Sequence, residues 1–217
     1  MVSPDVLKEV LKPSNSVLVV WDVHRALFNG IFNRDEFQRA LDTAINAARR
    51  VNVPIIFTKI TPFPRGFEPV TAKIMQWRGG FRPEEMELIV QPQPNDVVIN
   101  KNTWSLFVGT NVELLLRNSG RYTVVFTGIA TDIGVETSAR HAYALGFMPV
   151  IISDAVSSYD REAHERSLAN MRRFFPVITL MNWLGIGREF RISLVSNWFL
   201  NFFIWLITMA KIYKFQD

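Results

Sequence analysis

The sequence predicts an α/β protein with a doubly wound parallel sheet. Six short apolar runs, rich in β-branched residues, have the length and composition of strands buried on both faces. They lie at Val17–Trp21, Pro54–Thr58, Asp96–Asn100, Arg121–Gly128, Met148–Ser153 and Val177–Leu180. Helical patterns separate these runs, and regular alternation of strands and helices is typical of a parallel sheet that is covered by helices.

The clearest helical pattern runs from Asn33 to Val51, where apolar residues recur at helical spacing. Asn33 and Glu36 at its start form a capping signal. Further helices are expected from Thr110 to Gly120, from about Gly134 to Gly146, and after Asp160. Glycine is common just past a helix end and aspartate just before a helix start, so these residues divide the pattern into separate elements.

Composition narrows the class of protein. The chain has 217 residues, of which 48% are hydrophobic and 20% charged, which suits one globular domain with a modest extension. The net charge is +4, but the Lys and Arg residues are scattered along the chain, so we expect no nucleic-acid partner. The chain contains no cysteine, which excludes disulfides, thiolate metal sites and thiol nucleophiles.

Two segments stand apart from the strand–helix pattern. Residues Ile60–Pro94, rich in proline and glycine, are expected to form a long excursion with short helices at most. Ile192–Ala210 carries no charge and, at ~1.5 Å per residue, would approach the ~30 Å thickness of the hydrocarbon layer. A membrane span and a helix packed on protein both remain open. We expect a domain at 1–181, located in the cytoplasm because no signal peptide is recognisable, and a hydrophobic extension at 182–217.

Three polar or special positions fall at predicted strand ends, where doubly wound sheets collect their functional groups. Asp22 follows the first strand directly, and burial there would raise its pKa and suit acid–base chemistry. Lys101 follows the third strand and could pair with Asp22. Gly134 lies between the fourth strand and a helix, where backbone N–H groups could accept an oxyanion or carboxylate.

These positions, with their surrounding blocks, resemble the isochorismatase-like hydrolase superfamily. The resemblance covers roughly Ser16 to Leu180. It is carried by Asp22, by the block Lys101–Thr110, by the block Gly128–Ala139 and by Gly146 to Ser158. It implies a three-layer α/β/α sandwich with a six-stranded parallel sheet, a homo-oligomer that is a dimer or tetramer, and a cis peptide at Ile129–Ala130.

The resemblance also bears on mechanism. In the amidase branch of the superfamily, an Asp and a Lys activate a cysteine that attacks an amide carbonyl. Gly134 stands at that cysteine position here. True isochorismatases also carry glycine there, and this implies vinyl-ether hydrolysis with Asp22 as general acid and Lys101 as its partner. The usual Asp-x-Gln start of the family reads Asp22-Val-His24 in this chain.

Several residues are candidates for contacts with the substrate. They are His24, Arg78, Trp104, Ile129, Ala130 and Ile133. Arg78, like Arg65 and Arg82, could bind a carboxylate, because a guanidinium makes bidentate contacts. Trp104 could line a pocket or belong to the core, and Asp132 could cap the following helix. His24 could ligate a metal, but no second histidine converges on it in the pattern, so we expect neither a metal nor a cofactor.

Two hypotheses follow. The first is a hydrolase that acts on a small anionic or carbonyl-bearing metabolite without a cysteine nucleophile, with catalysis by Asp22, Lys101 and the turn at Gly134. The second is a catalytically inactive protein of the same fold that serves as a binding or scaffold module, anchored through Ile192–Ala210 at a membrane or on protein.

Overall fold

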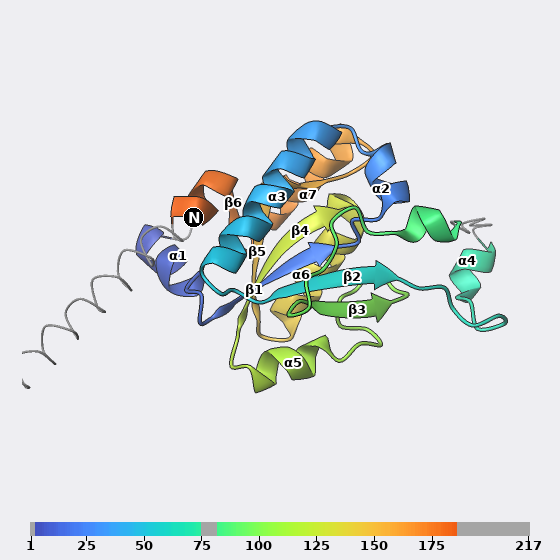
Figure 1. Cartoon of the computed structure of the whole chain (residues 1–217), viewed down its shortest axis with the longest axis horizontal. Coiled ribbons are helices and arrows are strands. Elements are labelled where there is room, and N and C mark those ends of the chain that lie inside the picture. Colours follow the sequence, from blue (N-terminus) through green and yellow to red (C-terminus); the bar gives the residue numbers. More distant parts are fainter. Residues whose placement is uncertain (1–2, 75–81, 186–217) are drawn as a thin grey trace, which may run out of the picture.

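The computed structural model of the protein describes residues 3–74 and 82–185 (Figure 1). All six predicted strands are present, in a single parallel sheet of order β3-β2-β1-β4-β5-β6. Their bounds are β1 Ser16–Trp21, β2 Ile55–Ile60, β3 Val97–Lys101, β4 Thr123–Ile129, β5 Met148–Ser157 and β6 Val177–Ile178. The predicted α/β fold with a six-stranded parallel sheet is therefore confirmed.

Four helices lie in the intervals that the sequence predicts as helical. They are α3 Arg34–Arg50, α5 Val112–Asn118, α6 Glu136–Ala144 and α7 Arg161–Met171. Two short helices, α1 Pro4–Val10 and α2 Arg25–Gly30, flank β1. In the described part of the excursion after β2, the helical elements are α4 Val70–Ile74 and a 3₁₀ turn at Pro83–Met86, as expected. Asp160 caps α7, since its carboxylate accepts the Ala163 N–H at 2.7 Å.

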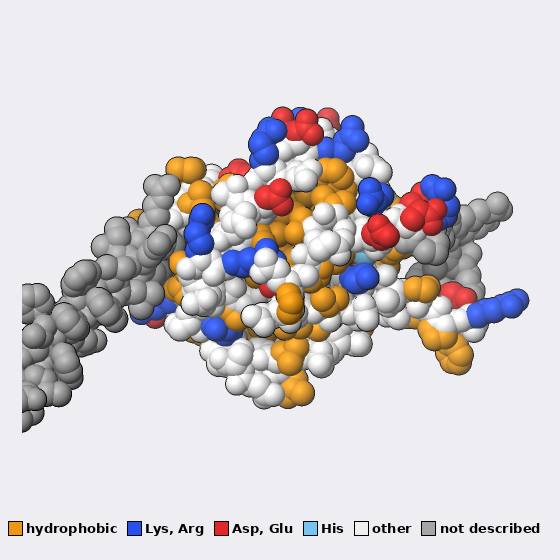
Figure 2. Space-filling view, viewed as in Figure 1, with side chains coloured by type: hydrophobic (Ala, Val, Ile, Leu, Met, Phe, Trp, Pro, Cys, Tyr) orange, Lys and Arg blue, Asp and Glu red, His pale blue; other side chains and the backbone are white. Residues whose placement is uncertain are grey.

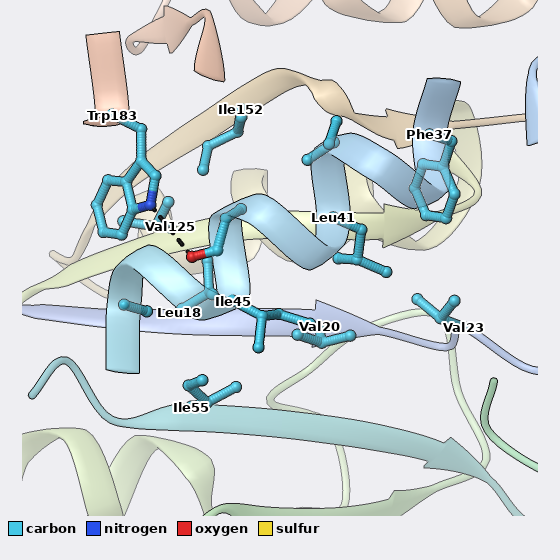
Figure 3. Close-up of a cluster of buried hydrophobic side chains, with 14 of the residues drawn as sticks. Leu18, Val20, Val23, Phe37, Leu41, Ile45, Ile55, Val125, Ile152 and Trp183 are labelled. Atoms are coloured by element: carbon cyan, nitrogen blue, oxygen red, sulfur yellow. Dashed lines mark hydrogen bonds between the residues drawn. The ribbon is translucent and has the colours of Figure 1, made fainter. Parts of the chain in front are cut away.

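Side chains of β1 alternate between two apolar layers, one on each face of the sheet. Leu18 and Val20 pack in the layer beneath α3, whereas Val17, Val19 and Trp21 pack in the layer that α5, α6 and α7 cover. Figure 3 shows part of the first layer, where side chains of β1, β2, β4 and β5 meet Leu41 and Ile45 of α3. The side chain of Trp21 is thus directed to the α6 face.

Three details of the sequence interpretation were wrong. First, β3 is not buried on both faces, because it lies at the edge of the sheet, where Val98 and Asn100 are exposed. Second, Asn33 precedes α3 but its side chain makes no capping hydrogen bond. Its amide oxygen instead accepts the hydroxyl of Ser157 on β5. Third, Asp132 does not cap a helix, because its carboxylate accepts the hydroxyl of Ser158.

Some expectations lie outside the described residues. The hydrophobic segment Ile192–Ala210 and the candidate Arg78 belong to this group. Within residues 3–74 and 82–185, no helix combines the length and the apolar character needed to cross a bilayer. On the face in Figure 2, Lys and Arg side chains lie apart and alternate with Asp and Glu. The cytoplasmic location, the homo-oligomer and the absence of a nucleic-acid partner stay predictions.

Candidate active site

The candidate site forms where three adjacent strands end at the carboxyl edge of the sheet. Asp22 follows β1, Thr58 lies on β2 and Lys101 is the last residue of β3. The backbone of Asp22 has φ 47°, in the left-handed region that aspartate tolerates better than most residues. The chain turns sharply out of β1 at this point, and the carboxylate is directed toward β2 and β3.

Asp22 and Lys101 form a buried ion pair, as the sequence predicts. The Lys101 Nζ donates to Asp22 Oδ2 at 2.6 Å and to the carbonyl oxygen of Thr103 at 3.1 Å. The second carboxylate oxygen, Oδ1, accepts the Thr58 hydroxyl at 2.5 Å, while the Asp22 N–H donates to the same hydroxyl oxygen at 2.9 Å. Both charged residues are 4% exposed. The carboxylate therefore has a fixed orientation.

Burial controls the protonation of this pair. Loss of water raises the pKa of the Asp22 carboxyl above its usual value, although the Lys101 ammonium and the Thr58 hydroxyl oppose the rise. Burial likewise lowers the pKa of Lys101, against the attraction of Asp22. A carboxyl group with a raised pKa can carry a proton at a higher pH than an exposed aspartate can, which is the property a general acid needs.

The loop after β4 brings Gly134 to the other side of the site. The Ile129–Ala130 peptide is cis, and residues Thr131–Val135 form a π-helical turn that leads into α6. The N–H groups of Ile133 and Val135 both donate to the carbonyl oxygen of Ala130, at 3.3 and 3.2 Å. Turns of this kind often occur at functional sites, and this one fixes the backbone around Gly134.

Trp21 fills the space beside Gly134. A Cβ atom added to Gly134 would lie 2.2 Å from Nε1 of the Trp21 indole. The Lys101 Nζ lies 4.0 Å from the centroid of the same ring. An indole that is 1% exposed therefore occupies the space that a side chain at position 134 would need, and it also contacts the ammonium of the ion pair.

His24 is fully buried beside the ion pair, and protein groups occupy both of its ring nitrogens. Nδ1 lies 2.6 Å from the carbonyl oxygen of Met86, and Nε2 accepts the Ile60 N–H at 3.0 Å. The neutral ring with the proton on Nδ1 satisfies both contacts, and burial lowers the pKa of His24. Its role here is to connect the excursion to β2. In the described part of the chain, no group of acidic and histidine side chains could hold a metal ion.

The remaining candidates have mixed outcomes. Trp104 is 52% exposed, so it does not belong to the core, and its side chain does not fill the space at Gly134. Arg82 pairs with Glu85 on its own exposed turn, at 2.8 Å. Ile129 and Ala130, which form the cis peptide, are buried and directly precede the turn that contains Gly134.

Sequence reasoning missed three residues of this site. Thr58 and Trp21 were treated only as strand residues, although each stands at the end of its run. The third is Tyr159, which is 45% exposed. Partial burial raises the pKa of Tyr159, and the negative charges of Asp22 and Asp132 raise it further. Tyr159 directly follows the block from Gly146 to Ser158 that carries the family resemblance, and this position could have identified it from the sequence.

Comparisons with known proteins agree with this geometry. Residues 16–181 match the profile of the isochorismatase domain. The uncharacterised isochorismatase family protein YwoC of Bacillus subtilis is 44% identical over 86 residues, which cover 40% of this chain and 44% of that protein. The ureidoacrylate amidohydrolase RutB of Pseudomonas syringae is 28% identical over 201 residues, with 76% of this chain and 80% of that protein covered.

A solved structure supports the same fold. The crystal structure of a cysteine hydrolase from Pseudomonas syringae pv. phaseolicola matches with a TM-score of 0.75 at 18% identity, covering 82% of this chain and 94% of that one. The chain spans less than half the length of the first curated relatives that it matches. The domain match nevertheless includes all six strands and every described residue of the candidate site. The chain therefore belongs to the isochorismatase family.

Proposed function

We propose that this protein hydrolyses a small, anionic vinyl ether without a cysteine nucleophile, with Asp22 as the general acid. The observation that supports this proposal best is the buried Asp22–Lys101 pair, in which burial raises the pKa of the carboxyl. The chain has no cysteine and carries glycine at position 134, so a covalent thioester route is not available to it. Acid catalysis requires only a proton donor and water.

The proposed reaction begins with proton transfer. The Asp22 carboxyl gives its proton to the terminal carbon of the vinyl ether, and the adjacent carbon becomes an oxocarbenium centre. Water adds to that centre and loses a proton to the Asp22 carboxylate, which restores the acid, and the resulting hemiketal breaks down to a carbonyl compound and an alcohol. The sum is one vinyl ether plus one water, giving one carbonyl compound plus one alcohol.

Lys101 and Thr58 stabilise the negative charge that develops on the Asp22 carboxylate. After proton transfer the carboxylate is negative, and the ammonium 2.6 Å from Oδ2 and the hydroxyl 2.5 Å from Oδ1 are already oriented to stabilise it. Donors that are fixed before the reaction lower the barrier because they need not reorganise. Lys101 also supplies positive charge toward an anionic substrate.

The test uses 2-ethoxyacrylate, a small anionic vinyl ether whose hydrolysis gives pyruvate and ethanol, alongside a panel of small amides. We expect pyruvate formation by the wild-type protein and a loss of roughly 10²–10⁴-fold in kcat for Asp22→Asn, because the amide cannot donate the proton in the same way. Asp35→Asn, on the exposed first turn of α3, is the control and should keep full activity. Equal rates for Asp22→Asn and wild type would exclude Asp22 as the acid.

A second candidate function is a binding or scaffold module that retains the fold without catalysis. The observation that favours it is the closure of the ion pair, whose two side chains are almost completely buried and fully engaged with protein groups. Buried pairs of this kind also occur as purely structural features. Absence of turnover in a folded wild-type protein, across vinyl ethers and amides, would favour this function over hydrolysis.

A further inference from the structure

Position 134 has no side chain, and the indole of Trp21 occupies the space where one would lie. An added Cβ at Gly134 would lie 2.2, 2.5 and 2.6 Å from Nε1, Cε2 and Cζ2 of Trp21. All three distances are below ordinary van der Waals contact. The ring packs in the layer beneath α6 and is 1% exposed, so neighbouring side chains limit its movement. Position 134 therefore requires glycine as long as residue 21 is tryptophan.

The same indole completes the surroundings of the Lys101 ammonium. An ammonium group has three N–H donors. Asp22 Oδ2 at 2.6 Å and the Thr103 carbonyl oxygen at 3.1 Å accept two of them, and the face of the Trp21 ring lies 4.0 Å from Nζ. A tryptophan face attracts a cation more strongly than other aromatic rings do, and the attraction grows when water is excluded. The buried ammonium thus has three favourable contacts, which are a carboxylate, a carbonyl oxygen and an aromatic ring.

We propose that Trp21 is a positioning residue that takes the place of the missing thiol and holds the Lys101 ammonium against Asp22. This inference rests on the proposed function, because it assigns Trp21 a task in the acid catalysis by Asp22. Trp21 and Gly134 then form one interdependent unit: the indole requires the glycine, and the ion pair requires the indole. The glycine is part of a rebuilt site rather than the trace of a lost one.

The first experiment tests whether the Trp21 ring and a side chain at position 134 compete for the same space. It does not require that the protein be catalytically active. Gly134→Ala is introduced into the wild type and into a Trp21→Leu background, and the melting temperature of each purified full-length protein is measured. In the wild type we expect a fall of several degrees, because the added methyl group overpacks a buried site. In the Trp21→Leu background this further fall should largely disappear. Equal falls in both backgrounds would show that the two positions are independent and would overturn the proposal.

The second experiment tests the effect on the ion pair. The titration of the Asp22 carboxyl is followed by NMR in protein labelled with ¹³C at aspartate carboxyls, with the Asp22 signal identified by its loss in Asp22→Asn. Trp21→Leu removes the ring face, so the ammonium is held less well and the pKa of Asp22 should rise by roughly 0.5–1 pH unit. Trp21→Phe keeps a weaker ring face and should give a smaller rise.

Phe126→Leu is the matched control, because Phe126 is another fully buried aromatic residue of the same layer. It should lower the melting temperature and leave the Asp22 titration unchanged. An unchanged titration in Trp21→Leu would reduce Trp21 to a space-filling residue and overturn the positioning role. If the wild type fails to hydrolyse 2-ethoxyacrylate but the titration shifts as described, the proposed function fails while the role of Trp21 in the ion pair stands.

Discussion

At the scale of single residues, the Asp22–Lys101 pair combines a stability problem with a chemical opportunity. Taking two charges out of water is costly, and their mutual attraction offsets that cost only while both partners are present. The raised pKa of Asp22 and the lowered pKa of Lys101 both express this cost, because in each case burial disfavours the charged form. The same cost gives the Asp22 carboxyl its capacity to hold a proton.

Removal of one partner should therefore destabilise the protein more than removal of both. We expect Lys101→Met to lower the free energy of unfolding by about 3–5 kcal/mol, because it leaves the Asp22 carboxyl buried without its cation. The folded-state pKa of Asp22 lies above its unfolded value, so stability is lost as the pH rises through the folded pKa. The deficit of Lys101→Met should thus grow with pH and shrink in acid.

Urea unfolding of the wild type, Lys101→Met and the double variant Asp22→Asn with Lys101→Met, each at pH 5 and pH 8, measures these differences. The double variant should be more stable than Lys101→Met at pH 8, because it buries no uncompensated charge. A double variant as unstable as Lys101→Met, at both pH values, would show that the lost packing rather than the lone charge causes the damage.

At the scale of elements, His24 connects the long excursion to the sheet. Its ring bridges the Met86 carbonyl and the Ile60 N–H, and beside it the Arg25 N–H donates to Glu87 O at 2.9 Å and the Ile89 N–H to Val23 O at 3.0 Å. Residues 86–89 therefore run along the start of α2 as a short antiparallel pairing. This pairing brings the end of the excursion next to Asp22.

This connection should make the fold sensitive to acid. The folded-state pKa of His24 lies below its usual value of about 6.5, so its contribution to stability is present above that value and is lost as the pH falls through the folded pKa. His24→Gln can make the same two hydrogen bonds, with an amide N–H toward Met86 and an amide oxygen toward Ile60, and it does not titrate.

We expect His24→Gln to unfold like the wild type at pH 7.5 and to lose less stability at pH 5, measured by guanidinium midpoints. His164, whose pKa burial also lowers, remains in both proteins, so part of the acid sensitivity should persist in the variant. If His24→Gln and the wild type lose the same stability between the two pH values, His24 does not control the acid response.

The elements also show how far the sequence can be interpreted. Apolar runs were sufficient to predict the six strands, and the positions of Asp22 and Lys101 follow from where two of those runs end. The exposure of β3 was not predictable from its composition, because strand order in a sheet depends on pairings between distant segments. The prediction that Asn33 caps α3 was wrong because its side chain accepts a hydrogen bond from Ser157 on β5, which is far away in the sequence.

The contacts of Trp21 were beyond sequence reasoning for a similar reason. Its alternation with Val17 and Val19 predicts the face of the sheet on which it lies. Nothing in its local pattern predicts that this face meets Gly134, which is far along the chain in the turn before α6. The absence of cysteine was visible in the sequence, whereas the approach of the Trp21 ring to Gly134 required the packed structure.

At the scale of the whole molecule, packing in the apolar layer beneath α3 determines the residue at which the domain ends. The predicted domain ends at residue 181, but residues 180–185 are helical, and Trp183 of this helix is buried in that layer. Figure 3 shows its ring against Val125, with its Nε1 donating to the Ala44 carbonyl oxygen of α3 at 3.4 Å. Leu184 packs against the same layer, so packing extends three residues past the predicted boundary at residue 181.

A chain shortened to end at residue 181 should consequently be less stable than one that ends at residue 185. We expect a loss of about 3–5 kcal/mol in the free energy of unfolding, the usual cost of removing a buried tryptophan side chain. Trp183→Ala in the full chain is the matched control and should show a similar loss, because it removes the same ring without shortening the backbone. Denaturant unfolding followed by circular dichroism gives all three values. Equal stability of the two shortened chains would place the end of the domain at residue 181 and would show that Trp183 does not contribute to the stability of the fold.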